Sequence, residues 1–312
     1  MVVYCRKGLS LVRRKSRRHK QLEILSYRYD LVEEERAELA NLNRGYEGEL
    51  KFDRVLADEF NDLNFIHIKD YCFKVGQNNF SSTKAENSID REVQIDNIII
   101  AGDRVITFEI KNYNFDLKYD DGHWAYLNGR KFSDPLIQIR LQKSYLQKMI
   151  EDLGFNLKVF STLVFVNPEQ TIYNLPEHPE IIIRSNLLKK LRKVLCENRY
   201  DYSRLLEQFE ARELPESQYQ GDIGVLFEEL NAGVFCEECG GKLMRMTLRF
   251  FRCNKCNINR TTLKMLNRLI YELKTLNSNW KITPSLINKF SGKEISESCV
   301  RKHKEAGNIE LK

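Results

Sequence analysis

Four cysteines in two matched pairs limit the fold of this chain more than any other feature. Two residues separate Cys236 from Cys239, thirteen residues follow, and Cys253 and Cys256 repeat the spacing. Four thiolates close a tetrahedral Zn²⁺ site and leave no open position, so the predicted zinc is structural. The glycines at 240–241 permit the tight turn after the first pair. A redox dithiol is the alternative, but it does not require two evenly built pairs.

Size and composition indicate an ordinary globular protein. The chain has 312 residues, of which 42% are hydrophobic and 30% charged, enough for one large core and one or two small modules. The other cysteines are scattered, at Cys5, Cys72, Cys196 and Cys299, which argues against a disulfide framework. No apolar stretch approaches the roughly 20 residues of a membrane span. We therefore expect a cytoplasmic protein without a membrane partner.

Positive charge gathers at the two ends of the chain. The formal net charge is +6, residues 260–312 are basic, and residues 1–20 contain no acidic residue. The basic residues of that first stretch are Arg6, Lys7, Arg13, Arg14, Lys15, Arg17, Arg18 and Lys20. Basic ends around an acidic centre suit a protein that binds a polyanion. The alternative is that both ends are solubilising only.

The pattern of apolar residues predicts the order of the elements. A helical stretch over 21–43 and a second helix from Tyr46 precede a strand at 65–71 and a polar loop at 76–87. Two apolar runs, 93–101 and 104–113, flank Gly102-Asp103 and predict a hairpin. A further hairpin is expected around Asn128-Gly129. Asp134 and Pro135 then begin a helix, followed by strands near 157–166 and 180–184 and a helix over 186–195.

These elements predict a mixed α/β fold with appended modules. We expect a basic N-terminal arm (1–40), an α/β domain (41–200) and a helical linker (201–232). A four-cysteine module (233–260) and a small, basic helical tail (261–312) follow. The tail's short helices are compatible with a helix-turn-helix.

The predicted hairpin carries a set of charged side chains with a chemical use. Residues two apart on a strand share a face. Gln94 and Asp96 therefore point to one side of the first strand, and Glu109 and Lys111 point to one side of the second. Carboxylates are hard ligands suited to Mg²⁺ or Mn²⁺, which activate water and neutralise charge on a phosphate. The lysine can orient the attacking water or stabilise the transition state. An exposed, solvated ion pair is the alternative.

Several short motifs in order resemble the nuclease-related domain (NERD) family. They are Gly45-Tyr46-Glu47-Gly48-Glu49, Gln94-Ile95-Asp96, Phe108-Glu109-Ile110-Lys111-Asn112, and Asp134-Pro135 with Gln138. The resemblance covers roughly residues 41–170. It implies a restriction-endonuclease-like fold of the PD-(D/E)xK superfamily, with a mixed sheet flanked by helices, and a metal-dependent nuclease activity.

The resemblance also assigns roles to single residues. It implies that Asp96 and Glu109 bind Mg²⁺ or Mn²⁺ and that Lys111 is the catalytic lysine. Glu49 matches the family's helix glutamate, which completes or supports the metal site. The alternative for Glu49 is an acid favoured at a helix N-terminus. Gln94 matches the glutamine before the aspartate.

The cysteine module is similar to the zinc ribbons at the C-termini of bacterial type I topoisomerases, which often bind single-stranded DNA. Phe250 and Phe251 are interleaved with Arg245, Arg249, Arg252 and Lys255, a mixture that suits stacking and phosphate contact. The alternative is that the phenylalanines form the ribbon's core. We expect a nuclease with a nucleic-acid partner, DNA more than RNA. A catalytically weak binding protein that acts with protein partners, or as a homo-oligomer, is the alternative.

Overall fold

The computed structural model describes residues 13–75, 91–197, 200–214, 221–222 and 224–311. The predicted loop at 76–87 and the first twelve residues of the basic arm lie outside these ranges. Contacts divide the chain into two compact units. Unit 1 comprises residues 1–14 and 43–217, and unit 2 comprises residues 15–42 and 218–312. Each unit therefore draws on separate stretches of the sequence.

Unit 1 is built on a mixed five-stranded sheet with the order β1-β2-β3-β6-β8. β1 to β3 are antiparallel, whereas β6 and β8 run parallel to β3. A small second sheet has the order β5-β4-β7. The strands are β1 (Ile66–Val75), β2 (Arg91–Ala101), β3 (Arg104–Lys111), β4 (Leu117–Asp120), β5 (His123–Tyr126), β6 (Lys158–Phe165), β7 (Ile172–Tyr173) and β8 (Ile181–Ile183).

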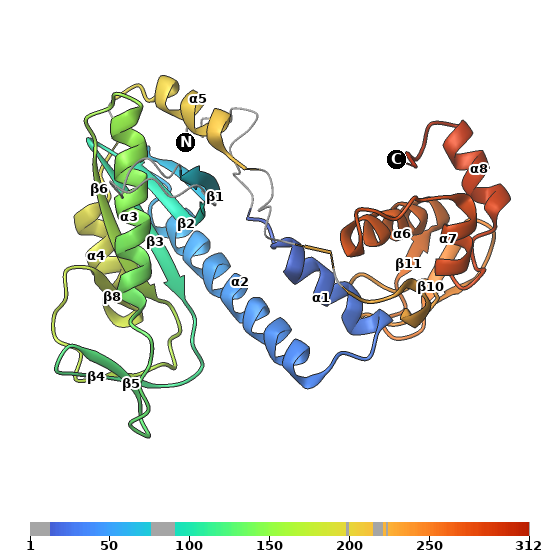
Figure 1. The fold of residues 1–312 in the computed structure, drawn as a ribbon, viewed down its shortest axis with the longest axis horizontal. Helices are drawn as coiled ribbons and strands as arrows, with labels where there is room; N and C mark the ends of the chain where they lie inside the picture. Colours follow the sequence, from blue (N-terminus) through green and yellow to red (C-terminus); the bar gives the residue numbers. More distant parts are fainter. Residues whose placement is uncertain (1–12, 76–90, 198–199, 215–220, 223, 312) are drawn as a thin grey trace, which may run out of the picture. The chain divides into compact units, whose positions relative to one another are not determined.

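Helices cover both faces of the large sheet (Figure 1). One face packs on α3 (Pro135–Asp152) and α5 (Ser203–Arg212), and the other packs on α2 (Glu33–Glu59) and α4 (Leu187–Val194). The sheet is buried on both sides, which explains the continuous apolar runs of its strands. The predicted mixed α/β class, with a mixed sheet flanked by helices, is confirmed.

Local sequence signals place the elements next to the site. Ala101 pairs with Arg104 across the two-residue turn, where Gly102 has a φ of 59°, a conformation that glycine adopts without strain. The side chain of Asp134 accepts a hydrogen bond from the Leu136 N–H and caps α3. The predicted hairpin and the predicted helix start are confirmed.

Two predicted boundaries differ from the structure. The first helical stretch was expected to end near residue 43, but it breaks after Arg28, and α2 then runs unbroken from Glu33 to Glu59. Tertiary packing of the apolar face of α2 outweighs the helix-weakening glycines within it. The hairpin expected around Asn128-Gly129 is mainly a hairpin of β4 with β5, and residues beyond that turn add a single bridge, Ala125 to Lys131.

Unit 2 combines α1 (Arg17–Arg28) with the C-terminal part of the chain. Its other elements are β9 (Leu243–Arg245), β10 (Phe250–Cys253), β11 (Asn259–Thr261), α6 (Thr262–Leu276), α7 (Pro284–Phe290) and α8 (Glu297–Glu305). Leu22 and Leu25 of α1 pack into one core with Leu269 of α6. Beside them, Arg28 forms a buried ion pair of 2.7 Å with Glu272. The predicted helices of the tail are present.

Candidate nuclease site

The candidate site lies where the ladder between β2 and β3 ends. The last pair is Asn97 with Phe108, so Asp96 and Glu109 are the first residues beyond it. The main-chain N–H of Ile110 donates to the carboxylate of Asp96 at 3.3 Å. A side chain thus takes the place of the missing strand partner and brings Asp96 toward the end of β3.

β1 is irregular beside the same point. Lys69 pairs with Asn97 and Tyr71 pairs with Ile95 on β2, and the residue between them on β1, Asp70, has a φ of 52°. This left-handed conformation is uncommon outside glycine and needs support from its surroundings. The sheet is therefore distorted next to Asp96.

Glu109 is held by three side-chain donors. Its Oε1 accepts from the Lys111 ammonium at 2.7 Å and from the Gln138 amide at 2.8 Å, and its Oε2 accepts from the Gln142 amide at 3.0 Å. Gln138 and Gln142 are four residues apart on α3 and face the same side. Glu109 is 5% exposed, so these bonds fix a buried carboxylate.

Lys111 remains a cation in this environment. Burial alone would lower its pKa, but the neighbouring carboxylate of Glu109 raises the pKa above the ordinary value. The Lys111 ammonium also donates to Gln138 at 3.1 Å. Its positive charge is therefore suited to stabilising negative charge nearby.

Asp96 and Glu49 sit in an acidic environment. Burial, followed by repulsion from Glu109 and Glu49, raises the pKa of Asp96 well above its usual range. Burial likewise raises the pKa of Glu49 to about 7, although Arg13 acts in the opposite direction. Carboxylates that repel one another in a buried place are stabilised by a cation bound among them.

Gln94 lies near this group, but its side chain is exposed. Its main-chain carbonyl accepts a hydrogen bond from the Gln142 amide at 3.0 Å. That contact links α3 to β2 through the backbone and involves no Gln94 side-chain atom. The role expected for Gln94 therefore stays a prediction.

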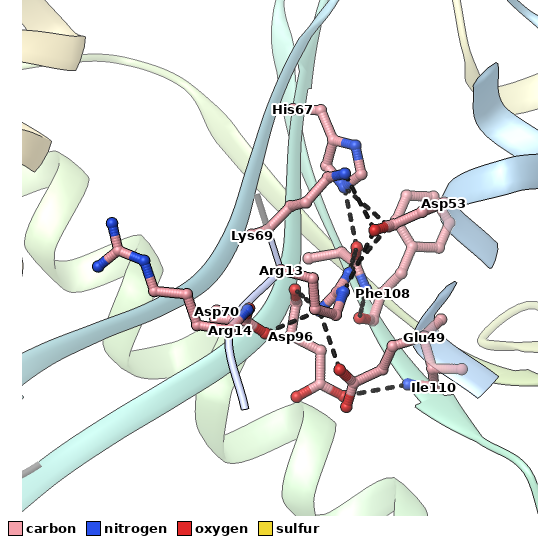
Figure 2. A network of polar contacts seen from close by, with 11 residues as sticks. Arg13, Arg14, Glu49, Asp53, His67, Lys69, Asp70, Asp96, Phe108 and Ile110 are labelled. Carbon is pink, nitrogen blue, oxygen red and sulfur yellow. Dashed lines mark hydrogen bonds and ion pairs between the residues drawn. The ribbon is translucent and has the colours of Figure 1, made fainter. Parts of the chain in front are cut away.

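Arg13 contacts both Glu49 and the main chain of Asp96 (Figure 2). Its side chain is 1% exposed and lies among groups from α2, β1 and β2. It donates to Glu49 at 3.2 Å, Asp53 at 2.9 and 3.3 Å, Asp70 at 2.8 Å, Asn97 at 2.6 Å and the main-chain carbonyl of Asp96 at 3.0 Å. The Arg14 N–H adds a bond to Asp70 at 2.8 Å.

Two further side chains complete this acidic network. Lys69 forms an ion pair of 2.9 Å with Asp53, and His67 lies 2.8 Å from the Asn97 side chain. Burial lowers the pKa of His67 to about 4, so this histidine is neutral near pH 7. The positive charge among the Asp53 and Asp70 carboxylates therefore comes from Arg13 and Lys69.

Arg13, Asp53, Asp70 and Gln142 were not predicted as site residues. One signal was available for Asp53, because it follows Glu49 by four residues on one helix and so shares its face. The same spacing relates Gln142 to Gln138. Arg13 gave no such signal, since it lies in a run of basic residues typical of a solvated arm.

The four paired cysteines converge in unit 2. Their sulfur atoms all lie within 4.8 Å of one another. Sγ of Cys236 is 3.7 Å from that of Cys256, and Sγ of Cys239 is 3.5 Å from that of Cys253. Zn–S bonds of about 2.3 Å in a tetrahedron require similar separations. The arrangement fits a Zn²⁺ ion held by four thiolates.

The ligand atoms of the carboxylate site are spaced more widely than those of the cysteine cluster. Among the described residues, Asp96, Glu109 and Glu49 do not form a group of ligand atoms within 4.8 Å, whereas the cysteines do. The donor set nevertheless fits a hard divalent cation, because it offers mutually repelling carboxylate oxygens and a lysine. Mg²⁺ keeps several waters and needs few protein ligands.

The ribbon's two phenylalanines differ in environment. Phe251 is buried in the core of unit 2, whereas Phe250 is 46% exposed. Arg245 binds main-chain carbonyls of Thr247 and Leu248, while Arg249 and Arg252 are exposed. One aromatic ring therefore belongs to the ribbon's core, and the other lies on a basic surface.

Comparison with known families matches residues 44–166 to the nuclease-related domain. The matched range contains Glu49, Asp96, Glu109 and Lys111 and ends before the cysteine module. No curated protein and no solved structure matches the chain. Within the described residues, every helix is too short or too polar to cross a bilayer.

Proposed function

Taking residues 44–166 as a nuclease-related domain, we propose that the chain hydrolyses phosphodiester bonds in nucleic acid, DNA in preference to RNA. The observation that carries the proposal is the meeting of Asp96, Glu109 and Lys111 at the end of the β2–β3 ladder. In the proposed reaction Asp96 and Glu109 hold Mg²⁺ or Mn²⁺, and Glu49 supports them.

Each group has a distinct part in this proposal. The bound cation would supply charge neutralisation at the phosphate and a more acidic water. Gln138 and Gln142 keep the Glu109 carboxylate in one orientation. Lys111 places a positive charge beside that carboxylate, where it can stabilise negative charge that develops on the phosphate oxygens. Preorganised charges of this kind give much of an enzyme's rate acceleration.

The cysteine ribbon and the basic tail would position the substrate. Arg249 and Arg252 present positive charge beside the exposed ring of Phe250. Such a surface suits phosphate contacts and stacking with unpaired bases. We place Zn²⁺ at the four cysteines as a structural ion, because four thiolates leave no position for a substrate.

A second candidate is a nucleic-acid-binding protein with little or no cleavage activity of its own. It is favoured by the wider spacing of the three carboxylates compared with the cysteines. In that case a partner would be needed for nucleic-acid processing.

The test is cleavage of labelled single- and double-stranded DNA and RNA with Mg²⁺, Mn²⁺ or EDTA. We expect metal-dependent cleavage that Lys111→Ala and Asp96→Asn reduce at least about a hundredfold. Lys158→Ala is the matched control, because this exposed lysine lies at the start of the neighbouring strand β6. Cleavage that persists in Lys111→Ala would contradict the assignment. Binding without cleavage under any condition would favour the second candidate.

A further inference from the structure

Arg13 lies outside the family-matched range 44–166 but inside the folded core of unit 1. A guanidinium has five N–H donors in a rigid plane. Here its three nitrogens donate to Glu49, Asp53, Asp70, Asn97 and the carbonyl of Asp96. These partners come from α2, β1 and β2. One side chain therefore ties the helix that carries Glu49 to the strand that carries Asp96.

The decisive contact is made by a single nitrogen. Nη1 of Arg13 donates both to Glu49 Oε2 at 3.2 Å and to the Asp96 main-chain carbonyl at 3.0 Å. Within the part of the chain that the structure describes, Arg13 is the side chain that donates to Glu49, whose own side chain has several rotamers. The shared donor fixes one oxygen of Glu49 relative to the backbone of Asp96.

The rest of the network holds the guanidinium itself in place. Asp53 receives two of its bonds, from Nε and Nη2, in the bidentate geometry that arginine favours with carboxylates. Asp70 accepts from Nη1 and from the Arg14 N–H, and this fixes the backbone on which Arg13 is carried. A lysine would supply the charge but not this fork of donors.

We propose that Arg13 is a positioning residue of the nuclease site. It holds the Glu49 carboxylate in a fixed position relative to Asp96, so that both can bind the divalent cation. The inference rests on the proposed function, because it concerns the same metal site. It makes residues 13–14 part of the nuclease unit and gives a basic residue of the N-terminal arm a role other than contact with nucleic acid.

The experiment measures Mn²⁺ affinity of the full-length, zinc-loaded protein, by calorimetry and by the electron paramagnetic resonance signal of free Mn²⁺. We expect Arg13→Ala and Arg13→Lys to raise the Kd about tenfold, as is typical when a residue that orients a metal ligand is lost. Arg14→Ala is the matched control, because Arg14 is an adjacent and exposed arginine. Its Kd should stay within about twofold of the unmodified protein, since exposed charges are screened.

A double-variant comparison separates positioning from general support of the fold. If Arg13 acts through Glu49, then Arg13→Ala should change the Kd by less than about twofold in a Glu49→Ala background. An equal effect in both backgrounds, or an unchanged Kd in Arg13→Ala and Arg13→Lys, would overturn the proposal. Circular dichroism checks folding, and Arg13→Lys carries the test if Arg13→Ala does not fold.

The same titration tests the proposed metal site separately from the role of Arg13. Asp96→Asn should weaken Mn²⁺ binding if the proposed metal site is correct. A Kd for Mn²⁺ that is unchanged in Asp96→Asn would refute the metal site and the role of Arg13 together. Binding that responds to Asp96→Asn but not to Arg13→Ala or Arg13→Lys would refute the role of Arg13 alone.

Discussion

At the scale of single residues, Gly48 allows α2 to approach the sheet closely enough to place Glu49. A Cβ at this position would lie 2.5 Å from the Cβ of Asn112 and 3.3 Å from a methyl group of Val166. A Cβ sits directly on the backbone, so Asn112 cannot give way by changing rotamer. Asn112 also donates from its side-chain amide to the main-chain carbonyl of Arg44 at 2.8 Å, which draws the same helix toward the end of β3.

We expect Gly48→Ala to destabilise unit 1 and to slow cleavage. Alanine would gain about 0.5–1 kcal/mol as a better helix former, but overpacking costs about 1–3 kcal/mol. The net loss should appear as a lower midpoint in urea unfolding. The cleavage rate should also fall, because the helix that carries Glu49 has to move away from the sheet.

Gly45→Ala provides the matched control on the same helix. Nothing lies within 4 Å of a Cβ at residue 45, so this variant should be more stable by about 0.5–1 kcal/mol. Equal effects of the two substitutions on stability would show that close packing at Gly48 is not the reason for the glycine.

At the scale of the elements, the cysteine module depends on its predicted metal. Its strands, β9 to β11, contain only three or four residues each. Such short strands are not stable in isolation. Cys236 and Cys253 are themselves buried in the core of unit 2, together with Leu243 and Phe251. Loss of the metal would therefore disturb that core as well as the ribbon.

Removal of zinc should unfold the ribbon and lower the melting temperature of unit 2. We expect about one zinc per chain by elemental analysis and a lower Tm after treatment with a chelator, because metal binding and folding are coupled. Cys239→Ser should act in the same direction. Cys196→Ser, at an exposed cysteine in unit 1, should leave zinc content and Tm unchanged. A metal-free protein with an unaltered Tm would contradict this prediction.

The sequence predicted individual elements better than their junctions. The β2–β3 hairpin, the start of α3 and the tail helices depend on local signals, namely a glycine turn, a capping aspartate and Thr283-Pro284. The break after α1 and the continuity of α2 depend on packing with residues far away in the chain. The segment predicted as a linker contains α5, whose Leu205 and Phe209 are buried against the sheet.

The candidate site was predictable only in part, for a similar reason. Asp96, Glu109 and Lys111 lie on adjacent strands, so their meeting follows from one hairpin and side-chain alternation. The residues around Arg13 come together from distant stretches of sequence, and no periodicity relates them. Contacts of that kind are determined by the tertiary fold.

At the scale of the whole molecule, unit 2 is discontinuous in sequence. Arg28 of α1 donates to Glu272 at 2.7 Å and to the main-chain carbonyls of Asn231 and Gly233 at 3.0 and 3.1 Å. Its guanidinium also lies 3.6 Å from the centre of the Phe290 ring. A buried arginine thus joins the N-terminal helix to the C-terminal part of the chain.

We expect Arg28→Ala to destabilise unit 2 by about 3 kcal/mol, because it removes one of the two arginines that pair with the buried Glu272. It also removes the donor to the main-chain carbonyls of Asn231 and Gly233. A Trp124→Phe background leaves Trp280 as the sole tryptophan, so fluorescence during denaturation reports on unit 2. Arg36→Ala is the control, since its 3.0 Å pair with Asp30 is exposed and should contribute at most about 1 kcal/mol. Similar losses in both variants would contradict the role of the buried pair.

The discontinuity of unit 2 also affects how the protein is made. Leu22 and Leu25 leave the ribosome early, whereas Leu269, against which they pack, is translated more than two hundred residues later. At about 5–20 residues per second the delay is on the order of tens of seconds. The whole of the family-matched segment, residues 44–166, emerges in that interval and can fold first. Throughout this time the apolar face of α1 lacks its native neighbours, which makes the nascent N-terminal helix a natural client for chaperones.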